Sequence, residues 1–88
     1  MDAKIQKVLE EKIRESISKG NEVTSVVKSL GHIENPNVFG RGIIIGRLYN
    51  SFYYQSRRVL NRSPTDQEFS EFIKLLKEHE NELQSTFS

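Results

Sequence analysis

The sequence predicts an all-α fold: one compact four-helix domain that spans residues 1–88 and has a long basic third helix. Apolar residues recur at spacings of three and four along most of the chain, which is the period of an amphipathic helix. Glycine or proline separates these periodic segments, as is typical of places where helices stop and start. Only the three isoleucines at 43–45 would suit a strand, and no second strand is available to pair with them.

The first two helices are predicted over residues 2–19 and 22–30. The first ends before Gly20, which suits a helix C-cap, and the second ends at Gly31. Valines lower the intrinsic helix propensity of the second helix, so its stability depends on packing. The apolar stripes predicted to face the core are Ile5, Val8, Leu9, Ile13 and Ile17, followed by Val23, Val26, Val27 and Leu30.

The third helix is predicted to follow a turn at residues 32–37 and to run to Leu60. Pro36 disfavours helical geometry at the residue before it, and Asn37 can cap the helix. On a helical wheel, the side chains predicted to face the core are Ile45, Leu48, Tyr49, Phe52, Ser56, Val59 and Leu60. The opposite arc is polar and contains Arg47, Asn50, Ser51, Tyr54, Arg57, Arg58 and Asn61.

The fourth helix is predicted to follow the break at residues 61–64, with Ser63 or Thr65 as its cap, and Pro64 suits its first turn. Acidic side chains at 66 and 68 suit the positive end of the helix dipole. The helix is expected to fray after Leu83. Its predicted core-facing side chains are Phe69, Phe72, Ile73, Leu76 and Leu83.

Charge is distributed unevenly although the net charge is only +1. Residues 35–65 contain no Asp or Glu and hold Arg41, Arg47, Arg57, Arg58 and Arg62, whereas residues 66–88 carry six acidic and two basic side chains. Arginine presents a planar fork of donors that matches phosphate and carboxylate, so this segregation indicates an anionic partner. The alternative is that the acidic last helix neutralises the arginines within the fold.

Nucleic-acid binding, to DNA rather than RNA, is the function that the polar arc favours. Phosphates need Arg or Lys, and base edges need side chains such as Asn. A short helix followed by a turn and a long basic helix also resembles a helix-turn-helix unit. We expect phosphate contacts from Arg41, Arg47, Arg57 and Arg58, and base contacts from Asn50 and Tyr54. The alternative function is a protein-interaction or homodimerisation module whose arginines meet an acidic partner.

Glycines near the start of the third helix allow two further hypotheses. Gly40, Arg41 and Gly42 would suit a small phosphorylated ligand if a helix N-terminus lay there. Gly42 and Gly46 also share a side of the helix with Tyr49 and Tyr53, where another backbone could approach closely. With the spare apolar side chains of Phe39 and Ile43, this side predicts a homodimer.

Composition also excludes several classes of function. The chain has no Cys, and His32 and His79 lie in different elements, so we expect no metal site and no cofactor. No spacing of nucleophile and base stands out, so we do not expect an enzyme. No apolar run approaches the ~20 residues of a membrane span, and no signal peptide is evident, so we expect a soluble cytoplasmic protein.

One short segment resembles a known family. Residues 58–68, Arg-Val-Leu-Asn-Arg-Ser-Pro-Thr-Asp-Gln-Glu, resemble the helix-junction motif of bacterial sigma-factor region 3, where Gly-Arg-x-Pro-Thr-x-x-Glu follows a leucine. Asn61 stands in place of the glycine, and the resemblance covers about an eighth of the chain. It implies a helical scaffold associated with nucleic acid.

Overall fold

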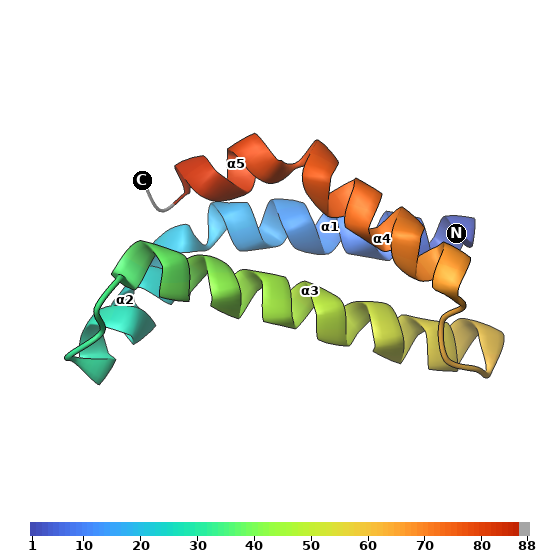
Figure 1. Ribbon diagram of the computed structural model, residues 1–88, viewed down its shortest axis with the longest axis horizontal. Helices are drawn as coiled ribbons and strands as arrows, with labels where there is room; N and C mark the ends of the chain where they lie inside the picture. The colour runs from blue at the N-terminus through green and yellow to red at the C-terminus, as the bar shows by residue number, and fades with distance from the viewer. Residues whose placement is uncertain (87–88) are drawn as a thin grey trace.

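The computed structural model describes residues 1–86 and contains, within them, five helices and no strand (Figure 1). The helices are α1 (Ala3–Ser18), α2 (Gly20–Leu30), α3 (Pro36–Leu60), α4 (Asp66–Glu78) and α5 (Glu80–Ser85). The all-α class predicted from the sequence is therefore confirmed. The helix count differs from the predicted four because the last predicted helix is divided at His79, whose backbone (φ −106°, ψ 11°) departs from helical geometry.

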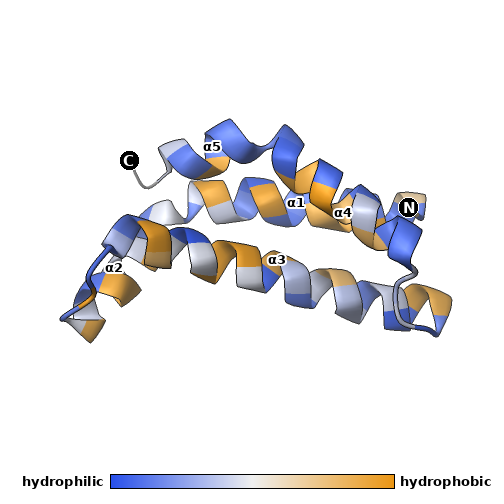
Figure 2. Ribbon diagram, in the orientation of Figure 1, coloured by the Kyte–Doolittle hydropathy of each residue, from blue (hydrophilic) through white to orange (hydrophobic). Residues whose placement is uncertain are grey.

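The helices form an elongated body of 40 × 22 × 20 Å. α3 runs antiparallel to α1 and to the α4–α5 segment, and α2 lies at the end where α3 begins (Figure 1). Both α1 and α2 pack against α3. Apolar and polar residues alternate in bands along α1 and α3, as the helical period requires (Figure 2).

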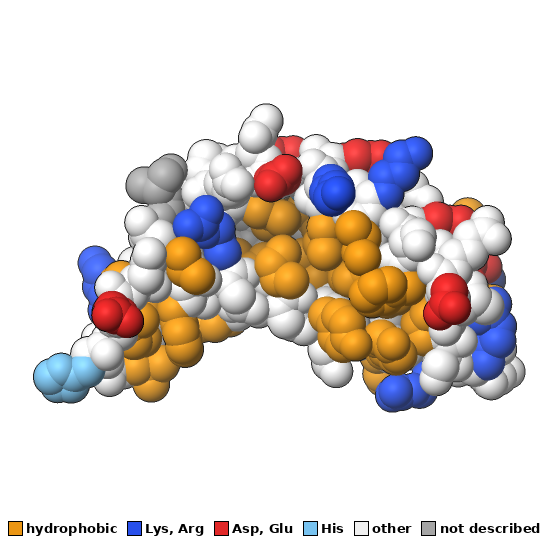
Figure 3. Space-filling view, in the orientation of Figure 1, with side chains coloured by type: hydrophobic (Ala, Val, Ile, Leu, Met, Phe, Trp, Pro, Cys, Tyr) orange, Lys and Arg blue, Asp and Glu red, His pale blue; other side chains and the backbone are white. Residues whose placement is uncertain are grey.

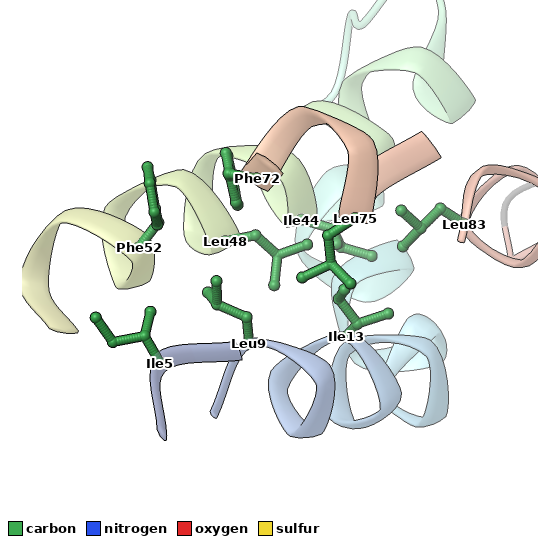
Figure 4. Close-up of a cluster of buried hydrophobic side chains, with 9 residues drawn as sticks. All are labelled: Ile5, Leu9, Ile13, Ile44, Leu48, Phe52, Phe72, Leu75 and Leu83. Atoms are coloured by element: carbon green, nitrogen blue, oxygen red, sulfur yellow. The ribbon is translucent and has the colours of Figure 1, made fainter. Parts of the chain in front are cut away.

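The core lies between α1, α3 and the α4–α5 segment. Its buried side chains are Ile5, Leu9, Ile13, Ile44, Leu48, Phe52, Phe72, Leu75 and Leu83 (Figure 4). The rings of Phe52 and Phe72 stack with centroids 4.5 Å apart and planes 3° from parallel, which joins α3 to α4. The predicted positions Ile5, Leu9 and Ile13 of α1 are thus confirmed.

The buried line of α3 is rotated by about one residue from the predicted one. Leu48, Phe52 and Ser56 are buried as predicted, but Ile44 takes the place expected for Ile45, which is 36% exposed. Tyr49 is 47% exposed. Ile44, Leu48 and Phe52 follow each other at intervals of four, as do Ile5, Leu9 and Ile13, and the two lines face each other across the core (Figure 4). Any of the three consecutive isoleucines at 43–45 could have faced the core. Packing against the buried residues of α1 selects Ile44. Ser51, expected on the polar arc, is buried as a result.

The stripes predicted for α2 and α4 are only partly buried. In α2, Val27 is buried, whereas Val26 and Leu30 are exposed because this helix lies at the end of the body. In α4 the buried side chains are Phe72 and Leu75, and the predicted core residues Phe69 and Ile73 are exposed at 37% and 38%. Two apolar side chains of α4 therefore point out of the core.

Side-chain caps fix where α3 and α4 begin. Asn35, rather than the predicted Asn37, caps α3, and its Oδ1 accepts a hydrogen bond from the backbone N–H of Val38 at 3.2 Å. α4 begins with a capping box at Thr65, one of the two predicted caps: the Glu68 N–H donates to the Thr65 hydroxyl at 3.2 Å, and the Thr65 N–H donates to Glu68 Oε1 at 2.9 Å. α3 ends at Leu60, and its C-cap residue Asn61 adopts a left-handed conformation (φ 56°, ψ 32°).

Candidate nucleic-acid interface

Five of the six side chains predicted to bind nucleic acid lie on one side of α3. They are Arg47, Asn50, Tyr54, Arg57 and Arg58, which recur at helical spacing and are all exposed. The Tyr54 side chain lies well open to solvent, with 57% of the residue's surface accessible. The buried line of Ile44, Leu48 and Phe52 lies on another side of the helix. These five side chains share one exposed side of α3, as their spacing predicts, although the predicted core-facing side of this helix was rotated from the observed one.

The sixth side chain, Arg41, lies apart from the other five. It lines a cavity between α3 and the α4–α5 segment together with Ile44 and Ile45. Its Nε donates to the backbone oxygen of Asn37 at 3.3 Å. Arg41 therefore does not share the exposed arginine side of α3, and its predicted phosphate contact would lie apart from those of the other arginines.

Lysines of α1 extend the arginine side of α3. Arg47 Nη2 lies 2.8 Å from Glu15 Oε1, which places that side of α1 beside the arginines. The same stripe of α1 contains Lys4, Lys12 and Lys19, at intervals of three or four residues from Val8 and Glu15. We define the basic face as Arg47, Asn50, Tyr54, Arg57 and Arg58 of α3 with Lys4 and Lys12 of α1 and its C-cap residue Lys19. The sequence analysis missed these lysines, although their periodicity could have indicated them.

Acidic side chains are few on the basic face. Glu15 accepts from Arg47 and lies 3.5 Å from Lys19 Nζ, and the Arg47 hydrogen bond lowers the pKa of Glu15 below its ordinary value. Glu11 is exposed on the outer edge of the same stripe. Within residues 1–86, Arg57 and Arg58 have no carboxylate partner, and the guanidinium of Arg57 instead lies over the Tyr53 ring, 5.6 Å from its centroid.

The acidic groups of the last helices form their ion pairs elsewhere. Glu68 binds Arg62, which lies outside α3, with Nη1 at 2.7 Å and Nη2 at 3.3 Å from its two oxygens. Glu71 accepts from the N-terminal amino group of Met1. Glu82 lies 3.2 Å from His79. In the part of the chain that the structure describes, no carboxylate of α4 or α5 pairs with an arginine of α3, so no ion pair supports the alternative of internal neutralisation.

The glycines of α3 do not lie at its N-terminus. α3 begins at Pro36, and the N–H of Phe39 already donates to the backbone oxygen of Asn35 at 3.0 Å. The N–H groups from Gly40 onward therefore lie within the helical hydrogen-bond pattern. The phosphate site proposed for residues 40–42 lacks the free backbone donors that it requires.

Comparison with protein families, with curated proteins and with solved structures found no match. Within residues 1–86, no helix is both long enough and apolar enough to cross a membrane. Over the same residues, no three potential metal-binding side chains of His, Asp or Glu lie together. His32 is exposed in the turn before α3, and His79 lies at the junction of α4 and α5.

Proposed function

We propose that this chain binds nucleic acid, DNA in preference to RNA, through the basic face. The observation that carries the proposal is the exposed group of Arg47, Arg57 and Arg58 on α3, which α1 lysines flank and which pairs with no carboxylate of α4 or α5 within residues 1–86. Solvent-exposed ion pairs between arginine and a carboxylate contribute little to the stability of a fold. Two arginines of this group have no carboxylate partner within residues 1–86, which leaves their donors available to phosphates.

Each member of the basic face has a role in this proposal. Arg57, Arg58 and the α1 lysines contact phosphates, and Arg47 does so when it exchanges Glu15 for a phosphate. The Asn50 amide can both donate to and accept from a base edge, as adenine recognition requires. The Tyr54 ring is exposed enough to stack on a base, and its hydroxyl can reach a phosphate.

The shape of α3 favours duplex DNA. An α-helix fits the major groove of B-DNA, about 12 Å wide, whereas the deep, narrow major groove of A-form RNA does not admit it. In the proposal, α2 and α3 act as a helix-turn-helix-like pair, with residues 31–35 as a turn longer than the usual motif. The homodimer predicted from the sequence would present two basic faces to successive grooves, and it is a separate proposal.

A second candidate is an interaction with an acidic protein through the same face. Arg and Tyr are enriched at protein interfaces, and Arg57 over Tyr53 is a preorganised pair of that kind. This candidate predicts no measurable binding to duplex DNA, so one titration separates the two.

Fluorescence anisotropy of labelled duplex DNA, single-stranded DNA and duplex RNA tests the proposal. We expect the duplex DNA to bind best, with affinity that falls steeply between about 50 and 200 mM salt. Absence of binding at about 50 mM salt, where nonspecific contacts are strongest, would contradict nucleic-acid binding. Binding that does not respond to salt would exclude phosphate contacts.

A further inference from the structure

A second surface of α3, which adjoins the basic face where Tyr49 and Tyr53 meet Asn50 and Arg57, is apolar and uncovered. We define the apolar face as Gly42, Ile45, Gly46, Tyr49 and Tyr53 of α3 with Phe69 and Ile73 of α4. Apolar side chains gather over the hollow between these two helices (Figure 3). The rings of Tyr49 and Tyr53 pack with centroids 5.1 Å apart, and together they form a ridge along α3.

A cavity of 320 Å³ opens beside this ridge, between α3 and the α4–α5 segment. Its apolar lining comes from Ile44, Ile45, Ile73, Leu76 and Leu83, and its polar lining from Arg41, Lys77, Glu80 and Gln84. The polar side chains of both signs stand around an apolar floor. This is the anatomy of a protein interface, in which an apolar centre has a polar rim.

We propose that the apolar face binds the same face of a second copy of this chain, with the two α3 helices packed antiparallel. In such a pair a two-fold axis crosses α3 between residues 47 and 48. Gly46 then lies opposite Tyr49 of the second copy, and Gly42 lies opposite Tyr53. The two pairs share one midpoint, so a single axis satisfies both.

The shape of α3 supports this arrangement. A Cβ atom added at Gly42 or Gly46 would meet nothing within 4 Å, so each glycine leaves a shallow space on the surface. A tyrosine ring from the second copy can occupy that space. Parallel packing in register would instead set tyrosine against tyrosine and leave the glycine spaces empty. The order Gly, Gly, Tyr, Tyr along one side therefore selects the antiparallel pair.

The distribution of charge also favours a second copy over a charged partner. On α3 no member of the apolar face from Gly42 to Tyr53 is charged. Arg47 turns toward Glu15 of α1, and the nearest charges stand at the edges of the face, Arg41 beside Ile45 and Arg57 over Tyr53. Two identical faces therefore meet without like-charge repulsion at their centre. Phe69 and Ile73 extend the contact to α4, so that two α3–α4 hairpins form a four-helix interface.

The size of the face sets the expected affinity. At 1.5 Å per residue, α3 from residue 38 to residue 57 is about 28 Å long, and two helix widths make about 20 Å. The projected area is therefore on the order of 550 Å² per copy, below the ~800 Å² of a standard interface. We expect a dimer that dissociates in the micromolar range.

The variant Gly46→Glu tests the surface. The added side chain enters open space in the single chain, so the helix should form at least as well as in the wild type. In the dimer it would place a charge against Tyr49 of the second copy. Sedimentation equilibrium should show a wild-type mass that rises to twice 10.2 kDa with concentration. Gly46→Glu should remain monomeric, and Ser70→Glu, an exposed change on α4, should behave as the wild type.

Cross-linking tests the antiparallel register, and the chain contains no Cys to interfere. A mixture of Gly42→Cys and Tyr53→Cys chains, one of them tagged, should form a disulfide-linked heterodimer under mild oxidation. A single variant alone should not form a cross-linked homodimer. In the proposed register, the cysteines of two identical chains lie about 16 Å apart along the helix axis, which is beyond the reach of a disulfide.

Three results would overturn the proposal. They are a wild-type protein that stays monomeric at high concentration, a dimer that Gly46→Glu leaves intact, and cross-links that form equally in single variants. A monomer that instead binds an apolar peptide would assign the face to another protein. None of these results depends on DNA, so they leave the proposed nucleic-acid binding untouched.

Discussion

Removal of Arg47 and Arg58 together is the sharpest test of the basic face. Arg58 has no carboxylate partner within residues 1–86, and the pair between Arg47 and Glu15 is exposed on both sides, at 43% and 40% of the side-chain surface. Glu15 keeps Lys19 at 3.5 Å after the change. Exposed pairs of this kind contribute little to folding, so Arg47→Ala with Arg58→Ala should leave the melting temperature almost unchanged.

The same variant should change DNA binding strongly. If about four of the six cationic side chains of the basic face each neutralise a phosphate, Arg47 and Arg58 among them, the slope of log affinity against log salt is about −3.6. Affinity should then fall about 150-fold between 50 and 200 mM salt. Loss of two phosphate contacts reduces the slope to about −1.8, so that affinity falls only about 12-fold between 50 and 200 mM salt. At low salt the double variant should bind about tenfold more weakly than the wild type, or weaker still.

Anisotropy titrations at several salt concentrations, with thermal unfolding of the same samples, measure both quantities. Arg14→Ala with Lys74→Ala is a matched control, because it removes the same charge from exposed positions outside the basic face. Unfolding at a much lower temperature with intact binding would show that the arginines serve the fold. An equal loss of affinity in the control would show that the overall net charge, rather than the position of the arginines on the basic face, determines DNA affinity.

Three further predictions concern the fold that supports the faces. Leu48→Ala should lower the free energy of unfolding by about 2–5 kcal/mol in chemical denaturation, whereas Ile45→Ala should cost less than about 1.5 kcal/mol, since only Leu48 is fully buried. Asn35→Ala should cost about 1 kcal/mol in thermal unfolding, because α3 loses its cap. Hydrogen bonds from Arg62, and then from the Thr65 backbone, lower the pKa of Glu68 from 4.5 to about 2. That contribution to stability is complete above pH 4.5 and lost as the pH falls toward 2, so unfolding measured over this range should vary less with pH in Glu68→Gln than in the wild type.

Local signals allowed the sequence to predict the elements well. Gly31, Pro36 and the segment from Asn61 to Thr65 mark helix boundaries by backbone chemistry that needs no tertiary contact. The capping box of α4 is of the same kind, since both of its partners lie within four residues. The α3 arginine group was also predictable, because side chains three and four residues apart share a side of any helix.

Tertiary packing decided what the sequence left open. Residues 43–45 are three isoleucines, so the period alone cannot tell which one enters the core, and the facing line of α1 selects Ile44. The placement of Arg41 follows from the same rotation. Lys4 and Lys12 belong to the basic face only because their side of α1 lies beside the arginines of α3. The ion pair between Arg47 and Glu15 shows this arrangement, which the sequence alone does not give.

The absence of acidic residues from 35 to 65 has a reason on each exposed side of α3. On the basic face, a carboxylate would repel phosphate and would pair with the arginines that are free. On the apolar face, a carboxylate near the two-fold axis would meet its own copy at close range, and an arginine there would be repelled in the same way. The two proposals together therefore account for a helix whose charges are all positive and stand outside or at the edge of the line of Gly42, Gly46, Tyr49 and Tyr53. Internal neutralisation by the last helices accounts for neither, because Glu68, Glu71 and Glu82 pair with Arg62, the N-terminus and His79, and within residues 1–86 no carboxylate of α4 or α5 pairs with an arginine of α3.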